Sequence, residues 1–167
     1  MTFKEVQTQD GSITFYNEEV DECYHTKSGA YEEALEKHVR PSEIVEKAKE
    51  NKEVVIADVC FGLGYNTLIA INEILKVVPE CKIKIIAFEN DKELLKQVHR
   101  LPFNDVNKKI KEFITKLTTP PYEAKQGVIS GKILVGDMRE TLSVVKKESV
   151  DVVFFDPFSP KKQPDLW

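Results

Sequence analysis

Residues 54–64 read Val-Val-Ile-Ala-Asp-Val-Cys-Phe-Gly-Leu-Gly, and this stretch decides the fold. Residues 54–59 form a short, mostly apolar run with charge before it and a glycine loop after it, which is typical of a strand buried on both faces of a parallel sheet. From Tyr65 to Val78, apolar residues recur at helical spacing. The stretch therefore predicts a strand, a glycine turn and a helix, which together are the first unit of an α/β fold.

The same alternation continues toward the C-terminus. Further strands are expected at 83–88, 133–135 and 150–155, and further helices at 94–98, at 106–117 within the longer connection 101–131, and from about Arg139. Strands that alternate with helices favour right-handed crossovers and a doubly wound, mostly parallel, Rossmann-like sheet. We therefore expect one α/β domain over residues 53–167.

Residues 1–52 are expected to form a β-hairpin and a helical cap in front of this domain. Apolar and polar residues alternate over residues 6–16 on both sides of Asp10-Gly11, a dipeptide suited to a hairpin turn. Ser28 can cap a helix that runs to about residue 39, and Pro41 with Ser42 can start another helix.

Composition excludes several classes of protein. The 167 residues carry 24 Lys and Arg against 28 Asp and Glu, a net charge of −4, and 41% of them are hydrophobic. These values suit an ordinary globular domain and exclude a disordered chain. Bulk charge gives no support to a nucleic-acid partner, so such a partner must be held by a local patch, such as Lys161-Lys162.

Neither a membrane span nor a metal site is expected. Charged residues interrupt every apolar run before it reaches the roughly 18 residues that span a bilayer, and the N-terminus lacks the pattern of a signal peptide. Cys23, Cys60 and Cys81 are odd in number and lack the spacing of zinc ligands. We expect a cytoplasmic protein with reduced thiols.

Candidate binding residues follow each expected strand, at the edge where open α/β sheets bind ligands. Gly62 and Gly64 follow the first strand, and glycine lets the backbone approach a ligand closely. Glu89 ends the second strand, where an acid can accept hydrogen bonds from both hydroxyls of a ribose. The loop lacks the third glycine of a dinucleotide fingerprint and the Gly-Lys-Ser/Thr of a P-loop, which argues against NAD and ATP.

The last two strands are followed by acids that suit an adenine and an amine. Asp137 can accept a hydrogen bond from the adenine amine while Met138 packs on the ring, although Asp137 could equally cap the next helix. Asp156-Pro157-Phe158 opens a loop stiffened by prolines. A carboxylate beside an aromatic ring suits a reaction at an amine, because it can accept an N–H bond and so orient the nitrogen lone pair.

Taken in order, these features resemble the class I S-adenosylmethionine-dependent methyltransferases. The resemblance is more specific to the methyltransferase part of the MnmC family, which makes 5-methylaminomethyl-2-thiouridine at the tRNA wobble position. It rests on residues 10–16, 24–30, 61–66 and, most diagnostically, 156–167. Family members commonly have Gly at the place of Cys60, Thr at the place of Leu63, and Asp-Gly-Phe-Ala-Pro at the place of residues 156–160. Cys60 fits easily if its position needs no positive φ.

The resemblance implies an N-methyltransferase that uses S-adenosyl-L-methionine, without a metal, to methylate an aminomethyl-uridine of tRNA. It also implies that a separate enzyme supplies this aminomethyl-uridine, and that the sheet of a complete fold continues past Trp167, so the chain is expected to be a fragment. Asp156 is the expected catalytic residue. The expected cofactor-binding residues are Tyr16, Phe61, Gly62, Leu63, Gly64, Asn66, Glu89, Asn90, Asp137 and Met138. The expected substrate-binding residues are Tyr24, His25, Ser28, Phe158, Lys161 and Lys162.

Other functions stay open at this point. An aminopropyltransferase of the spermidine synthase type also places a β-hairpin before the same sheet and alkylates an amine. Lys161-Lys162 argue against it, because cations beside the target Asp repel a polyamine and attract phosphate. A noncatalytic module that binds the cofactor or RNA is a further alternative. His25 is either a general base or a structural histidine held by hydrogen bonds.

Overall fold

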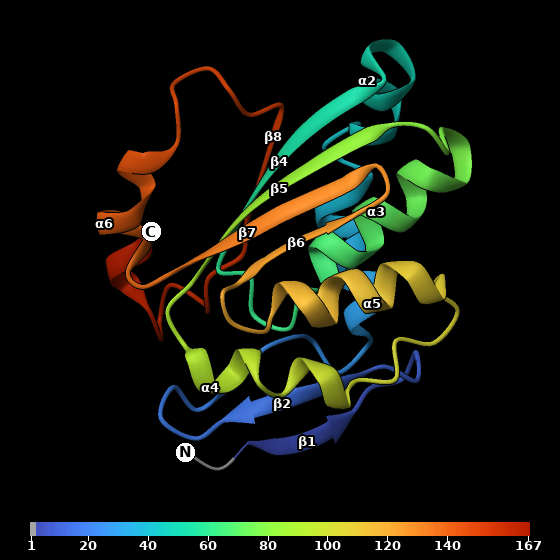
Figure 1. The fold of residues 1–167 in the computed structure, drawn as a ribbon. Helices are drawn as coiled ribbons and strands as arrows, with labels where there is room; N and C mark the ends of the chain where they lie inside the picture. Colours follow the sequence, from blue (N-terminus) through green and yellow to red (C-terminus); the bar gives the residue numbers. More distant parts are fainter. Residues whose placement is uncertain (1–2) are drawn as a thin grey trace.

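Two β-sheets organise the computed structural model, which describes residues 3–167 (Figure 1). The larger sheet has five strands in the order β6-β7-β5-β4-β8, and β6 alone runs antiparallel to its neighbour. These strands are β4 (Glu53–Val59), β5 (Lys82–Glu89), β6 (Glu123–Gln126), β7 (Ile129–Val135) and β8 (Val152–Phe155). The expected α/β fold with a mostly parallel sheet is confirmed.

Helices cover one face of the larger sheet and reach only part of the other, where Val153 stays 60% exposed. Helices α2 (Ile44–Asn51), α3 (Tyr65–Val77) and α5 (Lys108–Leu117) share one hydrophobic core with one face of the sheet. The short α6 (Met138–Thr141) and η3 (Leu142–Val144) lie toward the other face (Figure 1). The remaining helical segments are α4 (Lys92–Leu95), η2 (Val98–Arg100) and η4 (Pro164–Leu166). No helix in residues 3–167 is long and apolar enough to cross a membrane.

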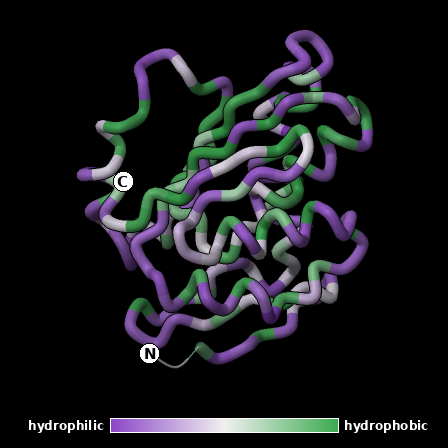
Figure 2. Tube along the Cα trace, in the orientation of Figure 1, coloured by the Kyte–Doolittle hydropathy of each residue, from purple (hydrophilic) through white to green (hydrophobic). Residues whose placement is uncertain are grey.

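Strands β4 and β5 lie at the centre because their side chains are apolar on both faces. Ile56 and Ile85 pack into the core beneath α3, whereas Val59 and Phe88 belong to a smaller cluster on the opposite face. Figure 2 shows hydrophobic residues along these central strands and hydrophilic ones in the surrounding loops. Burial on both faces explains why the sequence reads as a nearly continuous apolar run instead of an alternating one.

Several expected elements differ from the structure. Strand β6 was not expected, because its residues are polar and it lies at the edge of the sheet. Strand β7 begins at Ile129, before the expected residue 133. The sequence does not reveal this earlier start, because Gly131 interrupts the apolar run. A Cβ at Gly131 would lie 3.0 Å from Ile85 and 3.1 Å from Phe113, so a side chain there would press on both neighbours. The helix expected at 94–98 begins earlier, at Lys92, and is capped by Asp91.

The expected N-terminal β-hairpin is present and has a third strand. Strands β1 (Lys4–Gln7) and β2 (Ile13–Asn17) pair antiparallel, and β3 (Glu22–Cys23) pairs with β2. The helix expected to follow is divided into α1 (Ala30–Glu33) and the π-helical η1 (Ala34–Val39).

Ser28 does not cap this helix, contrary to expectation. The hairpin turn caps it from a distance: Asp10 Oδ2 accepts hydrogen bonds from Tyr31 N at 3.1 Å and Glu32 N at 3.2 Å. Ser12 Oγ accepts a further bond from Ala30 N at 3.0 Å. The next helix also begins later than expected from Pro41 and Ser42, because Glu43 adopts the left-handed conformation and α2 starts after it.

We expect Asp10→Ala to lower the free energy of unfolding by about 1–2 kcal/mol, because it removes a side chain that caps a helix. Desolvation raises the pKa of Asp10, but hydrogen bonds from Ser12, Thr8 and Glu32 outweigh it and lower the pKa below 3.8. The difference between wild type and variant should therefore be full above about pH 4 and shrink in more acidic solution. Urea denaturation at several pH values measures it. Glu50→Ala, on the exposed side of α2, is the control, and equal losses in the two variants would contradict the assignment.

Candidate active site

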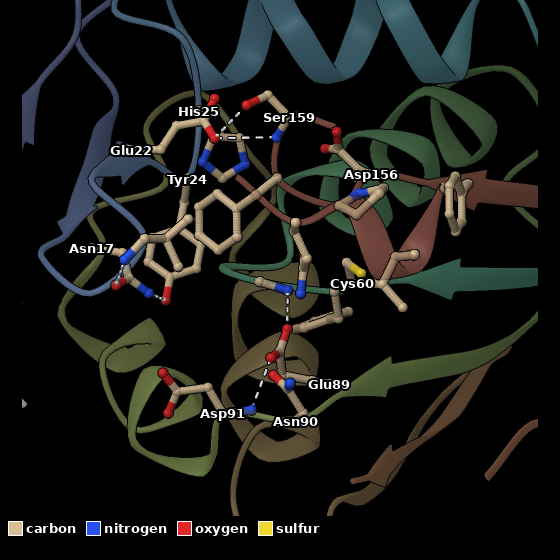
Figure 3. Close-up of a pocket in the computed structure, with 18 of the residues that line it drawn as sticks. Asn17, Glu22, Tyr24, His25, Cys60, Glu89, Asn90, Asp91, Asp156 and Ser159 are labelled. Carbon is tan, nitrogen blue, oxygen red and sulfur yellow. Dashed lines mark hydrogen bonds between the residues drawn. The ribbon is translucent and has the colours of Figure 1, made fainter. Parts of the chain in front are cut away.

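A crevice of about 1060 Å³ lies at the carboxyl ends of the parallel strands, between the larger sheet and the N-terminal strands (Figure 3). Small-molecule sites typically occupy roughly 300–1,000 Å³, so the crevice has room for a nucleoside cofactor and part of a second molecule. Its walls include the loop after β4, the end of β5, and the loops that follow β7 and β8. Open α/β sheets bind their ligands at this edge.

Glu89 holds the glycine loop in place. Its Oε2 accepts a hydrogen bond from Gly62 N at 2.7 Å, and its Oε1 accepts one from Asp91 N at 2.9 Å. Desolvation raises the pKa of the buried Glu89, and these backbone N–H groups act against that rise. Each carboxylate oxygen keeps a further lone pair, so the side chain can still accept hydrogen bonds from a ribose.

Cys60 has a φ of +62°, so the condition under which a cysteine would fit easily at this position is not met. A left-handed backbone costs a residue with a Cβ roughly 1–2 kcal/mol, which explains why glycine suits this position. Its side chain lines the crevice (Figure 3). Burial raises the pKa of the thiol to about 12, so Cys60 stays protonated near neutral pH and is a poor nucleophile.

Leu63 and Gly64 lie on the core side of the glycine loop and do not line the crevice. Leu63 is fully buried in the core. Gly64 has a φ of +80°, and a Cβ there would lie 2.6 Å from the Phe61 ring. Phe61 and Gly62 themselves line the crevice, as does Asn66 in the first turn of α3.

Asp156 follows β8 and faces the crevice (Figure 3). Its Oδ2 accepts a hydrogen bond from Asn66 Nδ2 at 3.0 Å and lies 3.4 Å from His38 Nε2. Desolvation raises the pKa of Asp156, but His38 and Asn66 outweigh it and hold the pKa below 3.8. Asp156 is therefore a carboxylate at neutral pH. His38 is not among the expected site residues, because its only signal in the sequence is a histidine within an expected helix.

The N-terminal strands hold the loop that carries Asp156. Glu22 Oε2 accepts hydrogen bonds from Ser159 N at 3.1 Å and from Ser159 Oγ at 3.0 Å (Figure 3). The Tyr24 and Phe158 rings pack with their centroids 4.9 Å apart, and Asn17 Nδ2 donates to the Tyr24 hydroxyl at 2.9 Å. An aromatic wall thus stands beside the carboxylate.

His25 is held as a structural histidine would be. It is buried, its Nδ1 lies 3.2 Å from Thr14 Oγ1, and its ring packs against the edge of Tyr65. Desolvation lowers its pKa below 6.5, so the imidazole is neutral near pH 7. These contacts favour the structural alternative, although the ring does line the crevice.

Asp137, Met138 and Asn90 all line the crevice on the side of Glu89. Asp137 accepts a hydrogen bond from Arg139 N at 2.9 Å and forms an ion pair with the Arg139 side chain. It is therefore the N-cap of α6, as the alternative interpretation of this residue expected. These contacts with Arg139 lower the pKa of Asp137 to about 2. Recognition of adenine by Asp137 stays a prediction.

Some expected site residues lie outside the crevice. The Tyr16 hydroxyl donates to Asp21, and the Ser28 hydroxyl is 2.8 Å from that of Thr26. Lys162 Nζ lies 2.9 Å from Asp21 Oδ2, so an acid balances one of the two expected phosphate-binding lysines. Lys161 is exposed and forms no ion pair within residues 3–167.

The polar groups of the crevice suit a ligand that donates hydrogen bonds. Asn66 Oδ1 is buried without a partner, and Glu89 keeps free lone pairs. S-adenosylmethionine carries such donors on its ribose, its adenine amine and its ammonium group, so the residues present fit it. Within the described part of the chain, no group of three or more His, Cys, Asp or Glu side chains could hold a metal ion.

Fold and crevice together define the class: an α/β chain built like the methyltransferases that use S-adenosylmethionine. Residues 102–167 match the model of a family described as S-adenosyl-L-methionine-dependent methyltransferase. The chain is similar to the crystal structure of MnmC2 from Aquifex aeolicus, with a TM-score of 0.87 and 40% identity over 99% of this chain and 53% of that one. The expected resemblance to MnmC-type methyltransferases is confirmed.

Curated proteins give similar matches. The chain is 28% identical, over 97% of its length, to an uncharacterized protein of Methanocaldococcus jannaschii. It is 22% identical, over 96% of its length, to the tRNA 5-methylaminomethyl-2-thiouridine biosynthesis bifunctional protein MnmC of Leptospira interrogans. The chain spans 43% of the former relative and 26% of the latter.

We expect Gly64→Ala to destabilise the fold much more than Gly127→Ala. Both glycines have a positive φ, so both variants lose roughly 1–2 kcal/mol of backbone stability. Only Gly64 has a neighbour, the Phe61 ring, where the new methyl group must go, and overpacking of this kind costs about 1–3 kcal/mol more. Thermal and urea denaturation of both variants measure the difference. Equal losses would show that the Phe61 ring moves away at no cost.

Proposed function

We propose that this chain is an S-adenosylmethionine-dependent N-methyltransferase that converts an aminomethyl-uridine at the tRNA wobble position to methylaminomethyl-uridine. One observation carries the proposal. The Asp156 carboxylate, ionised and held through Oδ2 by Asn66, faces the same crevice as Glu89, so an amine and a nucleoside cofactor can meet there. The similarity to MnmC2 and MnmC supports the choice of reaction.

Residues at the β5 side of the crevice would hold the cofactor. Glu89 would accept hydrogen bonds from the ribose hydroxyls, the backbone of Phe61 and Gly62 would lie against the cofactor, and Asn90 and Met138 would line the adenine. S-adenosylmethionine, when bound, supplies a methyl group that its sulfonium sulfur already activates. The protein therefore needs no group that generates the electrophile, and its main task is alignment of the two reactants.

Asp156 would orient the acceptor amine. A neutral amine donates an N–H bond to the carboxylate, which points the nitrogen lone pair at the methyl group. Positive charge develops on nitrogen during transfer, and a carboxylate already in place stabilises it. The Phe158 and Tyr24 rings provide a surface on which the uracil base can stack, as bases of single-stranded RNA stack on aromatic side chains.

The RNA itself would be held at the rim of the crevice by exposed cations. Lys27 and Lys161 are exposed and form no ion pair among residues 3–167, whereas Lys162 and Lys37 are paired with acids. With tRNA as substrate, a cytoplasmic location follows, and we propose that a separate enzyme makes the aminomethyl group. Acidic residues also line the crevice, among them Glu19, Glu22 and Asp91. They suit a polyamine, which keeps an aminopropyltransferase as the second candidate.

We expect Asp156→Asn to abolish methyl transfer and to leave cofactor affinity within a few fold, because Asp156 faces the amine. The measurement is single-turnover methylation of tRNA that carries the aminomethyl-uridine, at saturating S-adenosylmethionine. Glu123→Gln, at an exposed acid of β6 that does not line the crevice, is the control and should keep the wild-type rate. Putrescine, supplied with decarboxylated S-adenosylmethionine, is the competing substrate. Turnover of putrescine and not of tRNA would establish the aminopropyltransferase instead.

We expect Glu89→Gln to weaken binding of S-adenosylmethionine by about 1–3 kcal/mol, because an uncharged amide replaces a charged acceptor of hydrogen bonds. Calorimetric titration of the cofactor measures this loss. Glu93→Gln is the control, since Glu93 is exposed on α4 and pairs only with Lys96 there. An affinity unchanged in Glu89→Gln would reject the ribose assignment.

A further inference from the structure

His38 is buried against the carboxylate of Asp156 and has been given no role so far. Its side chain is only 12% exposed, and its Nε2 lies 3.4 Å from Asp156 Oδ2. At that distance and angle Nε2 makes no well-formed hydrogen bond, and it has no other partner among residues 3–167. Hydrogen bonds at catalytic sites are often long in the free enzyme and tighten when substrate binds.

An unusual helical turn presents this histidine. Segment η1 is π-helical, with Arg40 N donating to Leu35 O, five residues earlier, at 2.9 Å. Single π-helical turns are rare and are frequently found at functional sites. The His38 ring packs edge-on against Phe154 of β8, at a centroid distance of 5.9 Å, two residues before Asp156. The ring therefore packs against the end of β8, next to Asp156.

The two contacts of Asp156 fall on the same oxygen. Asn66 Nδ2 and His38 Nε2 both approach Oδ2, while Oδ1 has no hydrogen-bond partner among the described residues. A carboxylate held in this way presents its other oxygen to a ligand. Oδ1 is thus the atom available to the acceptor amine.

Acids surround His38 on several elements. Asp156 follows β8, Asp58 lies on β4, and Glu33 lies on α1, while the cationic form of His25 is disfavoured by burial. Burial lowers the pKa of His38, but the carboxylates of Asp156, Asp58 and Glu33 outweigh burial and raise it above 6.5. Burial also raises the pKa of Asp58, to about 7, so the charge of this cluster changes near neutral pH.

We propose that His38 is a positioning residue whose charge controls how strongly Asp156 stabilises the methylated amine. The proposal rests on the proposed function of Asp156. During transfer the nitrogen lone pair forms the new C–N bond as the C–S bond breaks, and the positive charge passes from sulfur to nitrogen. Neutral His38, with its proton on Nε2, would donate to Oδ2 once the contact tightens around the substrate, and it leaves one negative charge on the pair. Doubly protonated His38 cancels that charge and weakens the stabilisation.

The pH dependence of single-turnover methylation tests this role. In the wild type we expect the rate to rise with pH as His38 loses its charge. His38→Gln keeps an N–H donor near Oδ2 but does not titrate, so the part of the rise that comes from His38 should disappear from its profile. Deprotonation of the amine itself contributes equally to both profiles. His99→Gln, at an exposed histidine, is the control and should keep the wild-type profile. Identical profiles for wild type and His38→Gln would overturn the proposal.

Titration of the His38 ring by NMR provides a test that does not require activity. In the wild type we expect His38 to titrate above pH 6.5. In Asp156→Asn its pKa should fall by about one unit or more, because an opposite charge within about 4–6 Å accounts for a shift of that size. An unchanged pKa overturns the pairing, whether or not the chain methylates tRNA. A coupled pair in a chain that transfers no methyl group would instead contradict the proposed function, and with it the role of His38.

Discussion

One buried hydrogen bond holds the glycine loop against the larger sheet at the floor of the crevice: Gly62 N donates to Glu89 Oε2 over 2.7 Å. Glu89 ends β5 and Gly62 follows β4, so this bond joins the two central strands at the edge where ligands bind. A carboxylate removed from water needs replacement partners, and backbone N–H groups supply them. The left-handed backbone at Cys60 and Gly62 turns the N–H group toward the acid, which makes the strain at Cys60 part of the same arrangement.

The centre of the fold can be predicted from sequence, and its edges cannot. Strands β4 and β5 and helix α3 can be predicted because their burial demands apolar side chains over most of their length. Strand β6 is polar because it lies at the edge of the sheet, and Gly131 breaks the pattern of β7 because it packs against Ile85 and Phe113, which are remote in sequence. The cap from Asp10 to α1 is likewise a contact across the chain, which local propensity does not contain.

The candidate site shows the same difference between the centre and the edges of the fold. The positions of Glu89 and Asp156 in the crevice could be predicted, because the topology fixes where strands end and the topology follows from the strand pattern. Tyr16 and Lys162 could not be placed correctly, because both are paired with Asp21 and turned away by that contact. His38 depends on a π-helical turn, which has no recognised sequence pattern in this chain.

The hydrogen bonds between Glu22 and Ser159 join residues that are 137 positions apart. Bringing such distant segments together costs chain entropy that the short connections of the sheet do not incur. During synthesis Glu22 emerges early, and Ser159 follows only after every strand of the central sheet has been made. The contact can therefore form only after the strands of the central sheet have been made, so we expect the loop that carries Asp156 to reach its final position late.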